Sequence, residues 1–335
     1  MTRGTRNFLT GSAIVVALGL GTGLVAYYNG TLPIGASRAV FADLAYMPSD
    51  ASAVAYADVR AIMASEFRQK LRQILPTGEE LTRLKTDLGV DLEQDIDTVA
   101  AAYLGGSSSG QLGVVVVRGR FNEGQIEGLA TQHGAVVGEY KGKRLLTAPE
   151  RTAEHAMTGP DHSMPAIAFL EAGVLALGEV SAVKRAIDAG ATGDDIRKNA
   201  QLFDVINDVS TAGNAWFVAR LDALAAHEGM PAEIRDHLPA VDVFAASVHV
   251  NGGVRGALRA DARDDKAAEQ LRDVIRGALA AGRLVSGEDP RVNAMLNSLQ
   301  ITGTGKTVGL TFSVAPELLD ILNGIAAAHE LGTGK

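Results

Sequence analysis

The segment from Gly303 to Thr307, with the sequence GTGKT, has residue types that could bind a phosphate group. A phosphate-binding loop also needs a glycine six residues before its lysine, and that position is Gln300. Such a loop must open a helix, whose N-terminus then faces the phosphate. The residues from Thr307 onward instead alternate between polar and apolar, as in a strand. The pattern therefore predicts a hairpin turn and not a nucleotide site.

Two groups of histidine and acidic residues could supply metal ligands. One lies in a proline-bearing loop over residues 149–165 and the other brackets a helix start at Pro231; their members are Glu154, His155, Asp161 and His162, and His227, Glu228 and His237. Neither spacing matches a helical pair such as H-E-x-x-H, which presents two histidines on one face. We interpret both groups as surface residues, so the sequence predicts no metal site.

The sequence also lacks a convincing motif for nucleophilic or acid–base catalysis. The chain has no cysteine and no G-x-S-x-G nucleophile elbow. The acidic pairs Asp194-Asp195 and Asp264-Asp265 precede predicted helices, where carboxylates cap the first turn. Trp216 lies in a predicted strand, which favours a core position over a ligand platform. We expect no catalytic residue and no cofactor, and we favour a protein that is not an enzyme.

The clearest functional feature is an uncharged apolar run of 21 residues from Phe8 to Tyr28. As a helix it spans roughly 30 Å, the hydrocarbon thickness of a bilayer. Arg3 and Arg6 precede it, and the positive-inside rule then keeps the N-terminus in the cytoplasm. We expect a single-pass anchor in the inner membrane. The lipid bilayer is then its partner, and the main domain is periplasmic or extracellular.

Two further points concern this anchor. A cleaved signal peptide is the alternative, but its candidate cleavage sites, Ser37–Ala39 and Val40–Ala42, lie more than ten residues beyond the apolar run. That distance favours retention of the segment. Gly19 and Gly23 form a G-x-x-x-G inside the run, a spacing that lets two helices approach closely and would support a homodimer through the anchor.

Composition limits the remaining chain to an acidic globular domain. Removing the +2 of residues 1–30 from the total charge of −8 leaves −10. An acidic surface repels phosphate backbones, so we expect no nucleic-acid partner. Apolar residues make up 47% of the chain and aromatic residues only 5%, which favours a core of small and aliphatic side chains.

From about residue 210 the pattern of the exported part begins again. Three pairs of segments match in the same order: Ala53–Met63 with Asn214–Leu224, Asp97 onward with Asp242 onward, and Glu139–Thr147 with Ile301–Thr311. They read as strand into helix, then strand–turn–strand–helix, then a hairpin with a Gly-Lys turn. Convergent patterning is the alternative, because few residues are identical. We favour an internal duplication.

These patterns predict an α+β fold in which antiparallel sheets carry helices on one face, arranged as two duplicated units after one transmembrane helix. The expected ranges are 1–30 for the cytoplasmic N-terminus and anchor, 31–45 for a linker, 46–209 for the first unit, 210–330 for the second unit and 331–335 for a disordered tail.

The segment Ala45–Met63 (AYMPSDASAVAYADVRAIM) is similar to the start of exported bacterial proteins of unknown function. Val115–Phe121 (VVVRGRF), Glu139–Leu145 (EYKGKRL) and Gly173–Ile187 (GVLALGEVSAVKRAI) resemble recurring elements of the same uncharacterised family. The resemblance implies a membrane-anchored protein of the bacterial cell envelope, and it supplies no catalytic residue.

The leading hypothesis is a membrane-anchored extracytoplasmic scaffold or binding protein with partners in the envelope. The alternative is an extracytoplasmic ligand-binding or hydrolytic domain whose site lies between the two units. That alternative predicts a deep, polar-lined cleft at their junction.

Overall fold

The computed structural model describes residues 42–66, 94–107, 110–148, 165–221, 240–285 and 290–314. The strands are β1 (Ala53–Asp58), β2 (Ile96–Ser107), β3 (Gly110–Gly119), β4 (Val136–Tyr140), β5 (Lys143–Thr147), β6 (Pro165–Glu171), β7 (Val174–Glu179), β8 (Ala215–Arg220), β9 (Val241–Val250), β10 (Val254–Ala262), β11 (Gln300–Thr302) and β12 (Thr307–Val314). The helices are α3 (Val59–Met63), α6 (Glu123–Gln132), α7 (Val180–Thr192), the 3₁₀ turn η2 (Ile196–Lys198), α8 (Ala200–Ser210), α11 (Asp265–Val285) and α12 (Pro290–Ser298).

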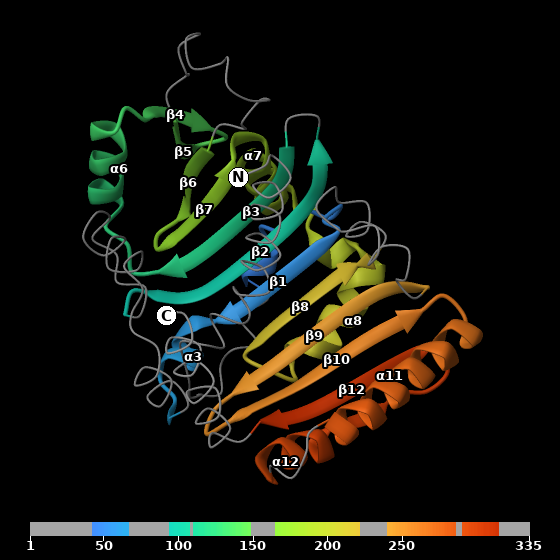
Figure 1. The fold of residues 1–335 in the computed structure, drawn as a ribbon. Helices are drawn as coiled ribbons and strands as arrows, with labels where there is room; N and C mark the ends of the chain where they lie inside the picture. The colour runs from blue at the N-terminus through green and yellow to red at the C-terminus, as the bar shows by residue number, and fades with distance from the viewer. Residues whose placement is uncertain are drawn as a thin grey trace, which may run out of the picture.

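Within these ranges all strands join one 12-stranded sheet in the order β11-β12-β10-β9-β8-β1-β2-β3-β7-β6-β5-β4 (Figure 1). Every neighbouring pair is antiparallel. We call β1–β7 the first wing and β8–β12 the second wing. The mixed helices and antiparallel sheet confirm the α+β class.

The sheet is continuous across the boundary where two separate sheets were expected. β1 pairs with β2 on one side and with β8 on the other, so the wings share a seam. At this seam Tyr56 stacks on Trp216, with ring centroids 5.8 Å apart, and Trp216 is almost fully buried. Two short strands with apolar side chains on both faces are buried best by pairing with each other, which explains the single sheet. Trp216 is a core residue, as predicted.

Helices cover both faces of the sheet, and the prediction of helices on one face was wrong. Neighbouring residues of β1 show this, because Tyr56 belongs to the cluster that includes α7 and α8, whereas Ala57 packs with Ile62 of α3. α6 packs over Leu146 and Phe169, on the opposite face from α7. The physical reason lies in β1, where all residues from Ala53 to Ala57 are buried. A strand that is apolar on both sides needs cover on both sides.

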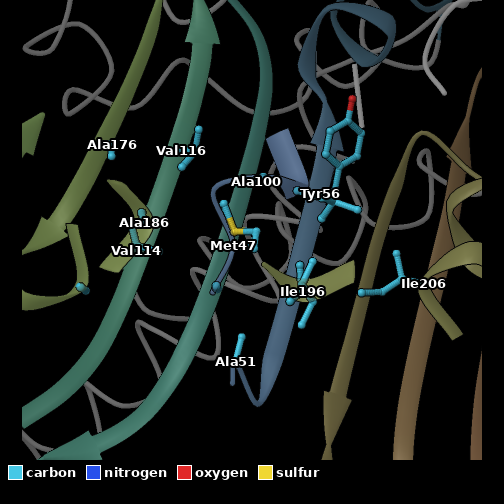
Figure 2. Close-up of a cluster of buried hydrophobic side chains, with 14 of the residues drawn as sticks. Met47, Ala51, Tyr56, Ala100, Val114, Val116, Ala176, Ala186, Ile196 and Ile206 are labelled. Carbon is cyan, nitrogen blue, oxygen red and sulfur yellow. The ribbon is translucent and has the colours of Figure 1, made fainter. Parts of the chain in front are cut away.

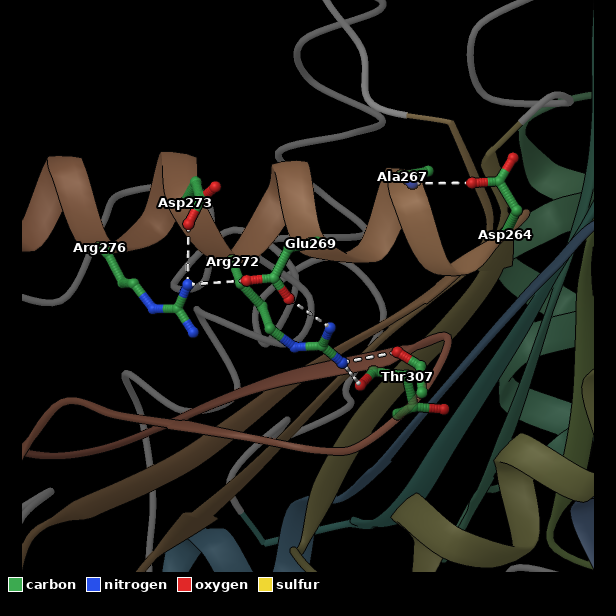
Figure 3. A network of polar contacts seen from close by, with 8 residues as sticks. Asp264, Ala267, Glu269, Arg272, Asp273, Arg276 and Thr307 are labelled. Atoms are coloured by element: carbon green, nitrogen blue, oxygen red, sulfur yellow. Dashed lines mark hydrogen bonds and ion pairs between the residues drawn. The ribbon is translucent and has the colours of Figure 1, made fainter.

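In the second wing, α11 covers the face opposite α8, with Ala267 and Ala268 packed against Ala262 and Val308. Asp264 begins the helix, since its Oδ1 accepts a hydrogen bond from the Ala267 backbone N–H at 2.8 Å. This confirms the predicted capping role of that acidic pair. Figure 3 shows this cap and the ion pairs further along the helix.

The GTGKT segment is a turn, as predicted. It joins β11 to β12, and its glycines Gly303 and Gly305 have φ angles of 84° and 55°, which glycine adopts most easily. Arg272 of α11 holds this turn, because its Nη2 donates to the backbone oxygens of Gly305 and Thr307 at 2.6 and 3.0 Å. No helix begins here, so the geometry for phosphate binding is missing.

Candidate functional site

The residues singled out from the sequence as an anchor lie outside the described ranges. These are Phe8 and Tyr28 at its ends and Gly19 and Gly23 at the expected helix–helix contact. The two histidine-bearing groups and the expected tail at 331–335 lie outside them too. Among the residues that the structure does describe, no helix is both long enough and apolar enough to span a bilayer. No cluster of three or more metal-binding side chains occurs in the same ranges.

The candidate functional feature is the segment of residues 42–52, which follows the predicted anchor in the sequence and which we call the strap. It comes directly before β1 and lies between the sheet and the helical layer of α7, η2 and α8. Leu44, Met47 and Ala51 are fully buried there, in the same cluster as Ile196 of η2 (Figure 2). The part of the chain that follows the predicted anchor is therefore built into the core.

Backbone hydrogen bonds tie the strap to several elements. Near its start, the Met47 carbonyl accepts from the Ile196 N–H at 2.8 Å, which joins it to η2. At its end, the Ser52 N–H donates to the Tyr103 carbonyl of β2, and the Ser52 carbonyl accepts from the Arg220 N–H of β8, both at 2.8 Å. The strap is thus hydrogen-bonded to strands of both wings, although it is not itself a strand of the sheet.

Side chains add two contacts between the strap and α7. Tyr46 lies against Gly190, where a Cβ atom would come within 2.7 Å of its ring. Glycine at this position therefore allows the helix to approach the strap closely. Arg185 of the same helix forms an ion pair with Asp50.

Asp43 secures the first residues of the strap through a buried polar cluster. Its side chain is fully buried, and its Oδ2 accepts a hydrogen bond from Thr98 Oγ1 at 2.5 Å. Its Oδ1 accepts from Arg118 Nε at 2.8 Å, and Arg118 Nη1 pairs with Glu171 Oε1 at 3.1 Å. These side chains come from the strap, β2, β3 and β6. We call Asp43, Thr98, Arg118 and Glu171 the Asp43 cluster.

The electrostatics of this cluster indicate a structural role. Burial raises the pKa of Asp43, although the Thr98 hydrogen bond and the charge of Arg118 oppose that shift. Burial lowers the pKa of Arg118, but the charges of Asp43 and Glu171 and the hydrogen bonds to them together outweigh burial, so the net shift is upward. Burial, with help from Asp58 and Asp43, also raises the pKa of Tyr56, whose hydroxyl is buried and has no partner among the described residues. The ion pair of Asp43 with Arg118 holds the strap against the sheet, beside a tyrosine whose hydroxyl burial keeps protonated.

Sequence reasoning missed the cluster because it assigned residues 31–45 to a linker. Residues 42–45 belong to the strap instead, and Asp43 and Leu44 are fully buried. The sequence did contain an indication of the cluster at Arg118, the residue that pairs with Asp43. Arg118 directly follows the apolar run Val114–Val117 inside one strand, and a charge at the end of a buried strand needs a partner.

At the junction of the wings, where the alternative hypothesis predicts a polar-lined cleft, the described residues of the seam show apolar packing. Along the described part of the seam, Val54 and Tyr56 of β1 and Trp216 and Val218 of β8 are almost fully buried in one cluster with the strap. Asn214, at the end of the seam, uses both atoms of its amide on the backbone of Val250. The seam is filled by apolar packing.

Comparison with known proteins gives little additional information. No family model matches the chain, and no curated protein matches it. Among solved structures, the crystal form I structure of TP0453 is similar at 10% sequence identity, with a TM-score of 0.47. That match covers 85% of this chain and 97% of the other.

Proposed function

We propose that this protein is a membrane-anchored scaffold or binding protein of the bacterial cell envelope, with its folded domain outside the cytoplasm. The strap is the observation that carries the proposal. The uncharged run from Phe8 to Tyr28 is expected to cross the membrane, and the strap follows it after a short interval. Because the strap is buried and bonded to both wings, a force on the tether reaches the whole sheet.

The remaining observations favour scaffolding over catalysis. The polar groups of the Asp43 cluster pair mainly with one another, and the seam is packed with Tyr56 and Trp216. The acidic pairs that could have served as general acids cap helices instead. Turnover by the purified full-length protein against a panel of hydrolase substrates, abolished by one point substitution, would contradict a non-enzymatic role.

Labelling of single cysteines tests the location, because the chain has no cysteine of its own. Val274→Cys places a thiol on α11, where the native side chain is 68% exposed, and Thr5→Cys places one before the anchor. In intact spheroplasts a membrane-impermeant maleimide should label the first thiol and not the second. Labelling of Val274→Cys only after lysis would place the domain in the cytoplasm and contradict the proposal. The mass of the mature protein separates a retained anchor from a cleaved signal peptide.

The same proposal includes two finer points. A homodimer through the anchor predicts that Gly19→Ile and Gly23→Ile reduce crosslinking in the membrane. An internal duplication is supported by the strand order, which runs β1-β2-β3 outward on one side of the seam and β8-β9-β10 on the other. The third matched pair fits less well, since β5 is separated from β3 by two strands whereas β12 lies beside β10. A relative with a single wing that dimerises through β1 would support the duplication.

A further inference from the structure

The two edges of the sheet differ in how they are protected. β11, at one edge, has only three residues, and short edge strands resist pairing with other chains. β4, at the other edge, has five residues, of which the first four are exposed. Val136 and Val137 are 57% and 42% exposed, and they are two of the four large apolar side chains that stand out as exposed in the described ranges. β4 contains no proline, so its outer side can accept another strand.

The hairpin geometry fixes which peptide groups of β4 face outward. Lys141 and Gly142 have φ angles of 48° and 76°, as in the two-residue turn that joins β4 to β5. In such a hairpin the closing pair, Tyr140 with Lys143, exchanges both of its hydrogen bonds, and the bonded pairs then alternate. The peptide groups of Val137 and Glu139 therefore point away from β5. No described residue pairs with them on the outer side.

We propose that two copies of this chain pair through β4, antiparallel and with their two-fold axis at Gly138, so that the two sheets join into one. This inference goes beyond the proposed scaffold function and does not depend on the membrane anchor. A two-fold contact uses the same surface on both copies, so the edge must be complementary to itself.

The outward groups of each edge are four, the N–H and the C=O of Val137 and of Glu139. Only one register uses all four of them. It places Val137 opposite Glu139 of the second copy, and each of these pairs can exchange two N–H···O=C bonds. A register centred on Val137 would need the N–H of Ala135, but that group already donates to the Ala130 carbonyl at 2.9 Å. A register centred on Glu139 would set two carboxylates side by side, which is unfavourable.

The side chains agree with this register. Gly138 meets its own copy at the axis, where the absence of a side chain leaves the strands free to approach. A Cβ at Gly138 would contact only the Leu145 carbonyl, at an ordinary 3.8 Å, so a substitution is tolerated there. Val136 lies opposite Tyr140 of the second copy at a position where side chains come closest. The exposed valine would thus gain an aromatic neighbour.

Cysteine crosslinking of the full-length protein in its membrane tests both the contact and the register. Gly138→Cys puts two thiols across the axis, and mild oxidation should give a disulfide-linked dimer. Val136→Cys is the matched control on the same strand. In this register its two thiols are offset by four residues, about 14 Å, whereas a disulfide needs Cα atoms within about 7 Å. Val274→Cys on α11 controls for random collisions.

A several-fold excess of dimer for Gly138→Cys over both controls is the expected result, and an equal yield would overturn the proposal. Crosslinking of Gly138→Cys to a different protein would also overturn it. Adding Val137→Pro removes an outward N–H and should abolish the dimer, whereas Val137→Thr keeps the N–H and should not. Should Gly138→Cys fail to fold, Val136→Cys co-expressed with Tyr140→Cys must give a mixed dimer, and its absence would count against the pairing.

Discussion

Helices pack on both faces of the first wing, whereas among the described residues the outer strands of the second wing have apolar packing on one face and polar side chains on the other. α7 and α6 pack on opposite sides of the first wing. In the second wing α8 packs on β8 and β9, and on the same face its Asp208 reaches β10 through an ion pair with Arg259, with Oδ2 and Nη1 2.5 Å apart. There, Arg255 and Arg259 of β10 lie beside Ser313 of β12 and its neighbours.

The sequences of the strands explain this difference. β1 of the first wing has apolar side chains on both faces, and every residue from Ala53 to Ala57 is buried, as is typical of a strand covered on both sides. β12 of the second wing alternates, with Val308 and Leu310 toward α11 and Thr311 and Ser313 on the other side. A matching order of elements therefore does not give matching burial. The side-chain period of each strand decides how many helical layers the wing requires.

The largest expected effect concerns the seam, which should make the two wings one cooperative unit. Trp216→Ala removes a fully buried ring that stacks on Tyr56. We expect the free energy of unfolding to fall by about 3–5 kcal/mol. Denaturant unfolding followed by circular dichroism measures it, and the whole transition should shift. Two separate transitions would show that the wings unfold independently.

Phe217→Ala is the matched control for that experiment. Phe217 is the next residue of β8, points to the other face and is only half-buried. Its loss should cost less, because less apolar area leaves water on folding. If the two variants lost equal free energy of unfolding, the stacking of Trp216 on Tyr56 would contribute no extra stability.

The second effect concerns the Asp43 cluster, which holds the strap to the first wing. Asp43→Ala leaves the Thr98 hydroxyl without its acceptor and Arg118 without one of its two carboxylates. We expect a loss of about 3 kcal/mol. Asp43→Asn keeps the shape and a hydrogen-bonding oxygen, so its loss should be clearly smaller. Hydrogen exchange should show faster opening of the strap in Asp43→Ala, and an unchanged strap would contradict the assigned role.

The same carboxyl predicts how stability depends on pH. Burial raises the pKa of Asp43 in the folded protein above its ordinary value of 3.8. The folded state therefore holds this proton at a pH where the unfolded state has lost it, and stability falls as pH rises between the two values. Relative to Asp43→Asn, the wild type should become less stable as the pH rises from below 3.8 through this window. A difference that grows in the opposite direction would mean that Arg118 outweighs burial.

The sequence predicted the local elements well and their assembly poorly. The turn at Gly303–Thr307, the cap at Asp264 and the core position of Trp216 depend on neighbouring residues, and all are confirmed. The single sheet depends on the pairing of β1 with β8, which are more than 150 residues apart. The Asp43 cluster likewise joins residues 75 positions apart. No short-range pattern encodes such contacts, so the first residues of the strap, 42–45, were assigned to a linker.

The smallest expected effect is confined to α11, the helix that covers the one-sided part of the second wing. Asp264→Ala removes the hydrogen bond to the Ala267 N–H and should lower the free energy of unfolding by about 1 kcal/mol. Asp265→Ala is the control, because the neighbouring acid lies in the first turn of the helix and contributes only a favourable charge, worth a few tenths of a kcal/mol up to about 1 kcal/mol. Hydrogen exchange should report earlier opening of α11 while the seam and the strap stay protected. Equal opening of all three would contradict the contrast between the wings, because it would mean that the outer strands are as tightly coupled to the core as β1 is.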